Sequence, residues 1–113
     1  MTDRDATHLS HIARSIAAID QYLVGVTEES FLTSPMVRDA VLRNLEIISE
    51  ASRRLSDELK ARYVSVPWRV IAAAGNFYRH EYDKVNEAVI WQTATASLEP
   101  IRTLLCDELG ERP

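Results

Sequence analysis

Apolar residues recur every three or four positions along most of this chain, and this spacing constrains the fold more than any other feature. One such stripe runs over 12–26 and a second over 37–59. The spacing is that of an amphipathic helix with one buried face. Ser34 and Pro35 precede the second stripe as an N-cap and a first-turn proline, a typical helix start. We therefore expect two long helices along these stripes.

Two further helical segments follow. The proline in VSVPW ends the second stripe and begins a short, alanine-rich helix expected over 68–82. A last helical pattern runs over 85–109, and Pro100 inside it should kink or split the helix. Strand alternation, hairpin dipeptides and internal repeats are absent from the sequence. The chain is thus predicted to form one all-α domain over 1–113, an up-and-down bundle with four main helices.

Composition limits the partners and the compartment. The net charge of −4 disfavours a general nucleic-acid-binding surface, but four cationic and two acidic residues between Arg62 and Lys84 leave a local positive region suited to a single phosphate. No apolar run approaches the roughly 20 residues of a membrane span, and no signal peptide is evident. Cys106 is the only cysteine and is expected to be a small buried residue. We expect a cytoplasmic protein without membrane contact.

The segment GNFYRHEYDKVN concentrates the chemistry of the chain. On a helix, Asn76 and His80 share one face, while Gly75, Arg79 and Tyr82 form a neighbouring stripe. An imidazole titrates near neutrality, and a guanidinium is a fork-shaped donor to phosphate. The pattern describes a metal-independent phosphodiester site, in which His80 takes a proton from the 2′-hydroxyl of RNA and a guanidinium stabilises the transition state.

Each of these residues also has an ordinary interpretation. His80 could be a surface or capping residue, and Arg79 could form an ion pair with Asp83 four positions on. A glycine inside a helix costs roughly 1 kcal/mol relative to alanine, so close packing of another helix could account for Gly75. Asn76 could satisfy backbone groups near the glycine, and the tyrosine at position 82 could be a half-buried ring.

Other side chains are weaker candidates. His8 and His11 are three residues apart and could mimic a metal pair, but the sequence places no third ligand beside them. A carboxylate pair four residues apart is expected on the polar face of its helix, and two tryptophans are expected in the core or at a dimer interface. These are Glu46, Glu50, Trp68 and Trp91.

Two segments, VLRNLEIISEASRRLSDELKARY and VPWRVIAAAGNFYRHEYDKVNEAVIW, resemble the HepT-like family of HEPN-domain proteins, also called DUF86. The resemblance covers about 36–91 and includes a long helix with an NL…IGEA-like stretch, a PW helix start and an RN…H.Y signature. It implies a HEPN bundle of four to five helices. Such proteins are usually homodimers in which the two signatures face a shared cleft.

The resemblance also implies a function. It suggests the toxin of a toxin–antitoxin pair, a metal-independent endoribonuclease without a cofactor that halts growth. The implied partner is an MntA-like minimal nucleotidyltransferase, which neutralises such toxins by transferring AMP to the signature tyrosine. Position by position, the resemblance makes Asn76 the signature amide, His80 the catalytic histidine and Tyr82 the AMP acceptor.

The sequence departs from the family signature at its first position, where Gly75 stands in place of the catalytic arginine. Arg79, one helical turn later, could lean toward the N-terminus and fill the vacated space. Alternatively, the chain has lost nuclease activity and is a non-enzymatic binding partner of a nucleotidyltransferase, or the glycine was introduced to make a toxic chain tolerable. The leading expectation is an RNA-cleaving toxin that uses His80, with Arg79 and Asn76 as phosphate contacts.

Overall fold

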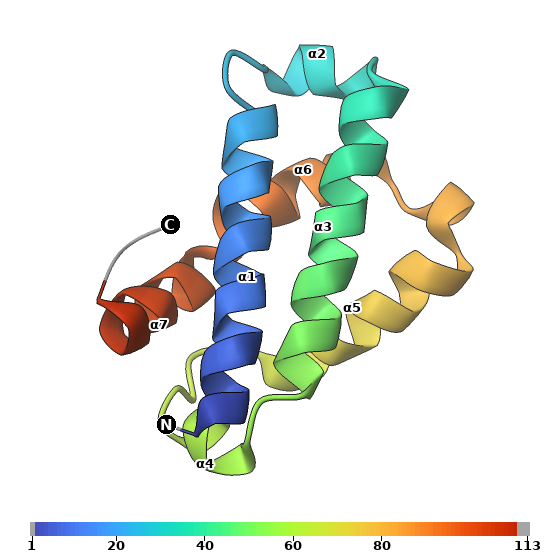
Figure 1. The fold of residues 1–113 in the computed structure, drawn as a ribbon. Helices are drawn as coiled ribbons and strands as arrows, with labels where there is room; N and C mark the ends of the chain where they lie inside the picture. Colours follow the sequence, from blue (N-terminus) through green and yellow to red (C-terminus); the bar gives the residue numbers. More distant parts are fainter. Residues whose placement is uncertain (1, 111–113) are drawn as a thin grey trace.

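The computed structural model describes residues 2–110, and within that range it contains helices and turns but no strand, which confirms the all-α prediction. Figure 1 shows the two longest helices side by side and antiparallel, with a third crossing behind one of them. The α-helices are α1 (Asp3–Tyr22), α2 (Glu28–Leu32), α3 (Pro35–Arg53), α4 (Asp57–Ala61), α5 (Trp68–His80), α6 (Glu87–Gln92) and α7 (Glu99–Leu109).

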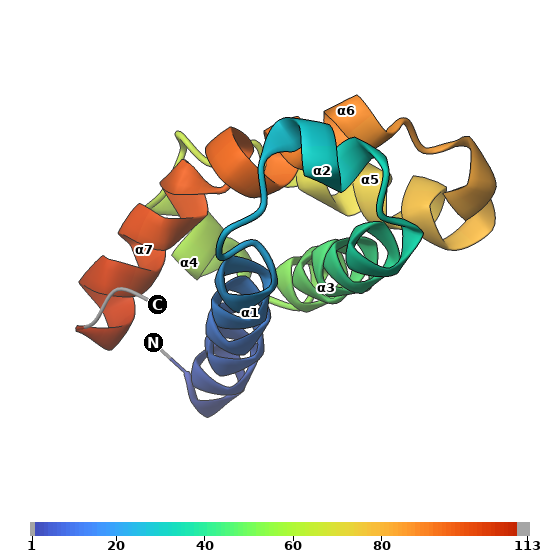
Figure 2. The same cartoon turned by 90° about the horizontal axis from the view of Figure 1, so that it is seen from above.

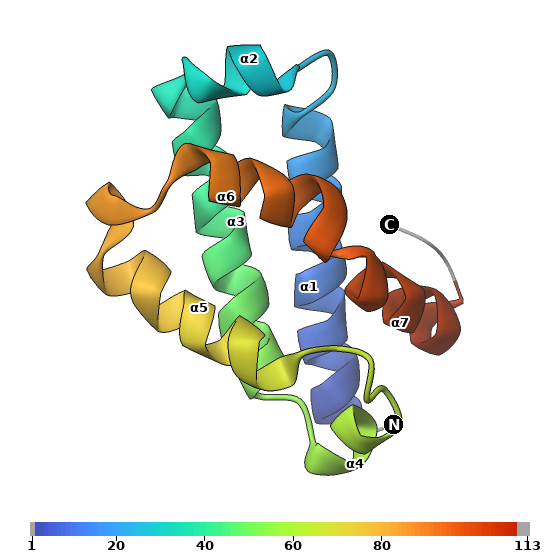
Figure 3. The same ribbon diagram turned by 180° about the vertical axis from the view of Figure 1, so that it is seen from behind.

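The bundle has two layers with the apolar core between them. Figure 2 shows α1 and α3 nearly end-on in one layer, and α5 and α6 lying across them in the other. Figure 3 shows the chain from α6 crossing α3 and α1, with α7 lying beyond α1. The core side chains come from both layers, and Ile16, Ile48 and Ile90 are almost fully buried. No described helix has the length and hydropathy needed to cross a bilayer.

The second predicted helix is broken, contrary to the expectation of one helix along 37–59. α3 ends at Arg53, and α4 begins three residues after the C-cap, with the Ser56 hydroxyl accepting a hydrogen bond from the Leu59 amide at 3.1 Å. Leu55 and Leu59 are nevertheless buried. The apolar spacing therefore continues across a turn, because the turn returns these side chains to the same core.

The last predicted helix is split, as Pro100 indicated. α6 passes into a π-helical turn, Thr93–Ser97, before α7 begins with Pro100 in its first turn. Proline fits there because the first-turn amides have no helical partner. The expected burial of Cys106 is wrong, since this residue lies on the exposed side of α7.

A buried carboxylate connects the start of α1 to the turn after α3. Asp5 is 2% exposed, and it accepts hydrogen bonds from the Ser56 amide at 2.8 Å and the Ser56 hydroxyl at 2.7 Å. Burial raises the pKa of Asp5, but the hydrogen bonds from Ser56 and Thr2 outweigh burial and bring the pKa below its ordinary value of 3.8. Asp5 thereby fixes the end of α3 against α1.

The close approach of α5 to α3 explains a glycine within a helix. A Cβ atom on Gly75 would overlap the Ser49 hydroxyl and lie 2.7 Å from the Ser49 Cβ. Ser49 cannot easily turn away, because its hydroxyl donates a 2.7 Å hydrogen bond to the Ile71 carbonyl of α5. The close-packing interpretation of Gly75 is therefore confirmed.

Replacing Asp5→Asn should lower the free energy of unfolding at pH 7 by about 2 kcal/mol, since hydrogen bonds to a charged group contribute about 1.5–3 kcal/mol. The folded pKa lies below the unfolded value, so the carboxylate stabilises the protein above pH 3.8 and this stabilisation is lost as the pH falls through the lowered pKa. Urea unfolding at several pH values should show the variant's deficit shrinking toward low pH. The exposed Asp3→Asn change serves as the control, and a deficit independent of pH would contradict the assignment.

Replacing Gly75→Ala should destabilise the protein, because overpacking costs about 1–3 kcal/mol and exceeds the roughly 1 kcal/mol gained in helix propensity. Ser49→Gly makes room for the new methyl group. In a double-mutant cycle by urea unfolding, the Gly75→Ala/Ser49→Gly protein should therefore lose less stability than the two single changes together. Strict additivity would show that the two positions are not in contact.

Candidate functional site

The C-terminal half of α5 separates its side chains into a buried and an exposed side. Gly75 and Tyr78 face α3 and the core, whereas Asn76, Arg79 and His80 are exposed. The pairing of Asn76 with His80 on one face agrees with the helical spacing of four. The packing of the glycine against α3 thus determines that the three polar side chains point to solvent.

Asn76 is the centre of a small polar cluster. Its Oδ1 atom accepts a 2.6 Å hydrogen bond from Arg79 Nη2 and a longer one, 3.5 Å, from Arg53 Nη1 of α3. Arg79 Nη1 also lies 3.7 Å from Glu50 Oε2. The ion pair expected between Arg79 and Asp83 is therefore replaced by a contact with α3, and the guanidinium is directed along α3.

The space beside Gly75 is not vacant. Ser49 occupies it, so the expectation that Arg79 fills a cavity left by the missing arginine is wrong in its geometry. Instead, the guanidinium groups of Arg53 and Arg79 both donate hydrogen bonds to the side-chain oxygen of Asn76, the residue after Gly75. These charges lie on the exposed side of α5, the side that also carries His80.

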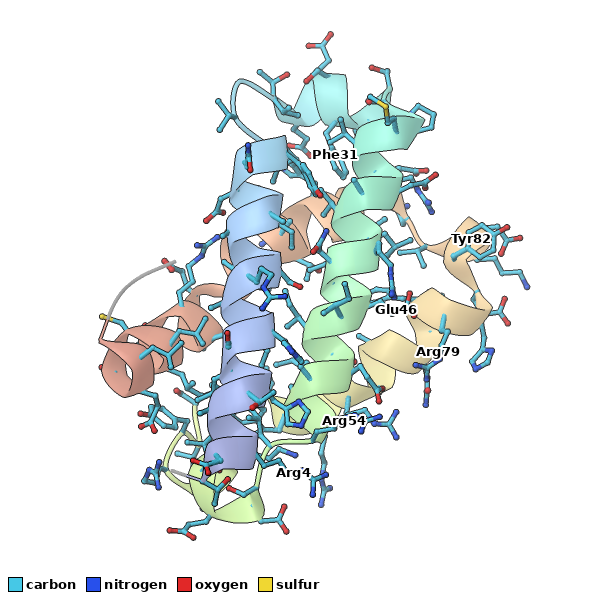
Figure 4. The ribbon with its side chains drawn as sticks, viewed as in Figure 1. Arg4, Phe31, Glu46, Arg54, Arg79 and Tyr82 are labelled. Carbon is cyan, nitrogen blue, oxygen red and sulfur yellow. The ribbon has the colours of Figure 1, made fainter. Side chains whose placement is uncertain are left out.

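Tyr82 lies outside the helix that carries the other signature residues. α5 ends at His80, and the Glu81 amide closes it with a 2.8 Å bond to the Phe77 carbonyl. Tyr82 begins a 3₁₀ turn and is 62% exposed. Figure 4 shows it at the outer edge of the molecule, away from Arg79. The predicted stripe of Gly75, Arg79 and Tyr82 is therefore broken at its last member.

Arg38 of α3, which the sequence did not single out, anchors the tyrosine segment. Its Nη2 atom donates to the Tyr82 carbonyl at 2.6 Å and to the Val85 carbonyl at 3.1 Å. Its Nε lies 3.3 Å from a Glu87 carboxylate oxygen, and the side chain is only 11% exposed. The backbone of Tyr82 is thus fixed while its ring remains accessible.

The weaker candidates of the sequence lie in the core or along α1 and α3. Trp68 and Trp91 pack against the core as expected, with the Trp91 ring centroid 5.3 Å from that of Phe31. The rings of His8 and His11 are 5.9 Å apart at the edge of a hollow that Glu46 and Glu50 also line. Among residues 2–110, no three His, Cys, Asp or Glu side chains are arranged to hold a metal ion.

An apolar groove runs along the other exposed side of α5. It encloses about 600 Å³ and is lined mainly by apolar side chains of α5, together with residues 84–86 and Val89 of α6. Val70, Phe77 and Val89 within it are 67%, 47% and 56% exposed. Phe77 precedes His80 by three residues, so the groove borders the polar side chains on the helix surface.

The contacts that complete the site were missed because they come from distant parts of the chain. Arg53 and Glu50 lie more than twenty residues before the signature, and Arg38 lies 44 residues before the carbonyl that it binds. The only local signal was the SRR sequence at 52–54, within the second stripe. These two arginines predict positive charge at the end of α3, but they do not predict that Arg53 contacts Asn76.

Comparisons with known proteins identify the family. The model of the family described as "Ribonuclease HepT-like" matches residues 12–107. "Probable ribonuclease HepT" of Thermococcus cleftensis is 30% identical over 95 residues, covering 84% of this chain and 86% of that protein. A "Putative RNase" of Caldanaerobacter subterraneus subsp. tengcongensis is 35% identical over 86 residues, covering 76% and 77%.

A Methanocaldococcus jannaschii protein named "Gamma-glutamylcyclotransferase and putative RNase" is 32% identical over 95 residues, which are 84% of this chain but only 43% of that protein. The comparison with solved structures gives no match. The family model covers most of the chain, and the all-α bundle is of the HEPN type. The chain therefore belongs to the ribonuclease HepT-like family.

Proposed function

We propose that this protein is the toxin of a toxin–antitoxin pair, an endoribonuclease that acts without a metal ion and inhibits growth. The observation that carries the proposal is the exposed cluster at the end of α5, where His80 follows Asn76 by one helical turn and the Asn76 side chain binds Arg79. Membership of the ribonuclease HepT-like family supports it. A cytoplasmic location accompanies this function.

In the proposed reaction, His80 acts as general base and removes the proton of a 2′-hydroxyl group. The 2′-oxygen forms a bond to phosphorus, the bond from phosphorus to the 5′-oxygen breaks, and the leaving 5′-oxygen takes a proton from water. The products are a 2′,3′-cyclic phosphate and a 5′-hydroxyl group. Arg79 and Arg53 are the guanidinium groups near enough to stabilise charge on the phosphoryl oxygens, in place of the arginine absent at position 75.

The proposal includes a homodimer, in which a second copy of the chain binds at the apolar groove. The apolar groove of Val70, Phe77 and Val89 leaves large apolar side chains exposed, as an interface does before its partner binds. Because His80 borders that groove, a homodimer formed there would bring two His80 side chains to one cleft. Light scattering of the purified protein should give the mass of two chains.

Tyr82 is the proposed acceptor of AMP from an MntA-like nucleotidyltransferase antitoxin. Its exposed ring on an anchored backbone suits a modification by another enzyme. The phenol oxygen would attack the α-phosphorus of ATP, lose its proton and release pyrophosphate. Tyr78, the other tyrosine of the segment, is 9% exposed, and burial raises its pKa, so it is a poor competitor.

A second function remains a candidate because of Gly75. With Ser49 packed against it, α5 carries no arginine at the signature position, and the protein could act as a non-enzymatic partner of the nucleotidyltransferase. Tyr82 would matter in that function and His80 would not. The two functions differ in whether RNA is cut.

Cleavage of RNA by the purified protein in the presence of EDTA distinguishes the two functions. His80→Ala should slow cleavage by about 10²–10⁴-fold, and Arg79→Ala by about 10²–10³-fold. Arg69→Ala, an exposed change at the other end of α5, is the matched control. RNA with 2′-deoxyribose at the cut site should remain intact. Intact RNA and normal growth with the parent protein would favour the non-enzymatic function.

The modification can be measured by intact mass after coexpression with the nucleotidyltransferase. The mass should rise by whole AMP units, and Tyr82→Phe should abolish the increase because the acceptor oxygen is gone. Tyr22→Phe, at a tyrosine that is 42% exposed on α1, controls for a general effect of removing a phenol. An adduct that persists on the Tyr82→Phe protein would assign the modification to another residue.

A further inference from the structure

A hollow beside the candidate site collects charged side chains from three helices. It encloses about 380 Å³ between α1 and α3, and Arg79 closes it from the end of α5. Figure 4 shows Arg54, Glu46 and Arg79 on the same face of the molecule, along α3 and at the end of α5. Its volume lies within the range of about 300–1,000 Å³ typical of small-molecule sites. The side chains used below are His8, His11, Arg43, Glu50, Arg54 and Arg79.

The hollow is positive although the protein is acidic. Three arginines and two glutamates line it, so its side chains carry a net charge of +1 when both histidines are neutral. The whole chain, by contrast, has a net charge of −4. Arg43 pairs with Glu46 at 3.4 Å, but its side chain is 65% exposed and can turn toward a ligand. Exposed pairs of this kind contribute only about 0–1 kcal/mol, so exchanging one carboxylate for another anion is inexpensive.

Glu50 shows that the arginines converge on one anion. Its Oε1 accepts from Arg54 Nε at 3.1 Å and Nη2 at 3.0 Å, and its Oε2 lies 3.7 Å from Arg79 Nη1. The hydrogen bond from Arg54 lowers the pKa of Glu50 most, burial opposes it, and the charges of Arg54, Arg53 and Arg79 lower it further. The guanidinium groups of Arg54 and Arg79 both contact this single carboxylate, so one positive charge beside it is not neutralised.

His8 supplies an unused polar atom at the α1 side of the hollow. Its Nδ1 is buried and has no hydrogen-bond partner among the described residues. Burial lowers the pKa of His8, and the positive charges of Arg4, His11 and Arg54 lower it further. A buried polar nitrogen without a hydrogen-bond partner costs free energy, and His8 is among the side chains that line the hollow.

We propose that this hollow binds a phosphate group of the RNA strand adjacent to the phosphate that is cut. Arg43 and Arg54 would bind the phosphate oxygens, and Arg79 would lie between the two phosphates. Single-stranded RNA is commonly held by a line of basic side chains that follows its backbone. The inference rests on the proposed function, because it needs RNA to occupy the end of α5.

Binding of a fluorescent 2′-O-methyl RNA of about 12 nucleotides tests the proposal without cleavage, because its 2′-oxygens are blocked. The Arg43→Gln/Arg54→Gln protein should bind it about tenfold more weakly, and the slope of log K against log salt concentration should fall by about 0.7 for each phosphate that the variant no longer neutralises. The control is Arg62→Gln/Arg69→Gln, which removes the same charge from exposed positions outside the hollow and should bind like the parent.

Glu50→Gln should have the opposite effect. It removes the internal anion that Arg54 and Arg79 now face, so RNA should bind several-fold more tightly. A purely structural role of these arginines predicts no such gain. Arg43→Lys/Arg54→Lys keeps both charges and should retain most of the affinity, which distinguishes weakened phosphate binding from a folding defect of the glutamine variant.

Unchanged affinity and salt slope in Arg43→Gln/Arg54→Gln, or no RNA binding by the parent, would overturn the proposal. Displacement of the RNA by an equal concentration of AMP would also overturn it, since the ligand would then be a free nucleotide. If the variants behave as expected while cleavable RNA stays intact, the phosphate site stands and the nuclease function fails. Binding and cleavage are thus tested separately.

Discussion

The bundle depends on α3, which packs against both α1 and α5. α1 packs on one side of it and α5 on another, so α3 buries apolar residues toward both, and at the closest approach to α5 its residue must be small. Ser49 meets the second requirement by lying directly against a glycine and bonding to an α5 carbonyl. This contact sets the rotation of α5 about its axis. The exposure of Asn76, Arg79 and His80 follows from that rotation.

The same helix also separates the two chemical roles proposed for the signature. Near its end, α3 presents Arg53 and Glu50 to Asn76 and Arg79. Near its start, Arg38 binds the carbonyl of Tyr82. The end of α5 at His80 lies between these contacts, so the histidine and the tyrosine belong to different structural units. A change at the tyrosine can therefore add bulk and charge to the 3₁₀ turn without disturbing the helix that carries the histidine.

Much of the fold could be predicted from local sequence patterns, and the errors of that prediction have physical reasons. Helical spacing, the Ser34 cap and the position of Pro100 predicted α1, the start of α3 and the break before α7. Spacing failed at the end of α3, because buried leucines on both sides of a turn kept the same period. The helical stripe was likewise extended through Tyr82, although the chain leaves α5 after His80. The partners Arg38, Glu50 and Arg53 depend on how helices pack, which local spacing does not encode.

The contact between Ser49 and Gly75 also limits which residues position 75 can accept. An arginine at position 75 cannot share the present geometry with a serine at 49, because its Cβ alone would overlap the hydroxyl. The glycine instead lets α5 lie directly against Ser49 of α3. An arginine at position 75 would require a smaller residue at position 49 or a shifted α5. The two positions are therefore coupled, and a single Gly75→Arg change is unfavourable in this packing.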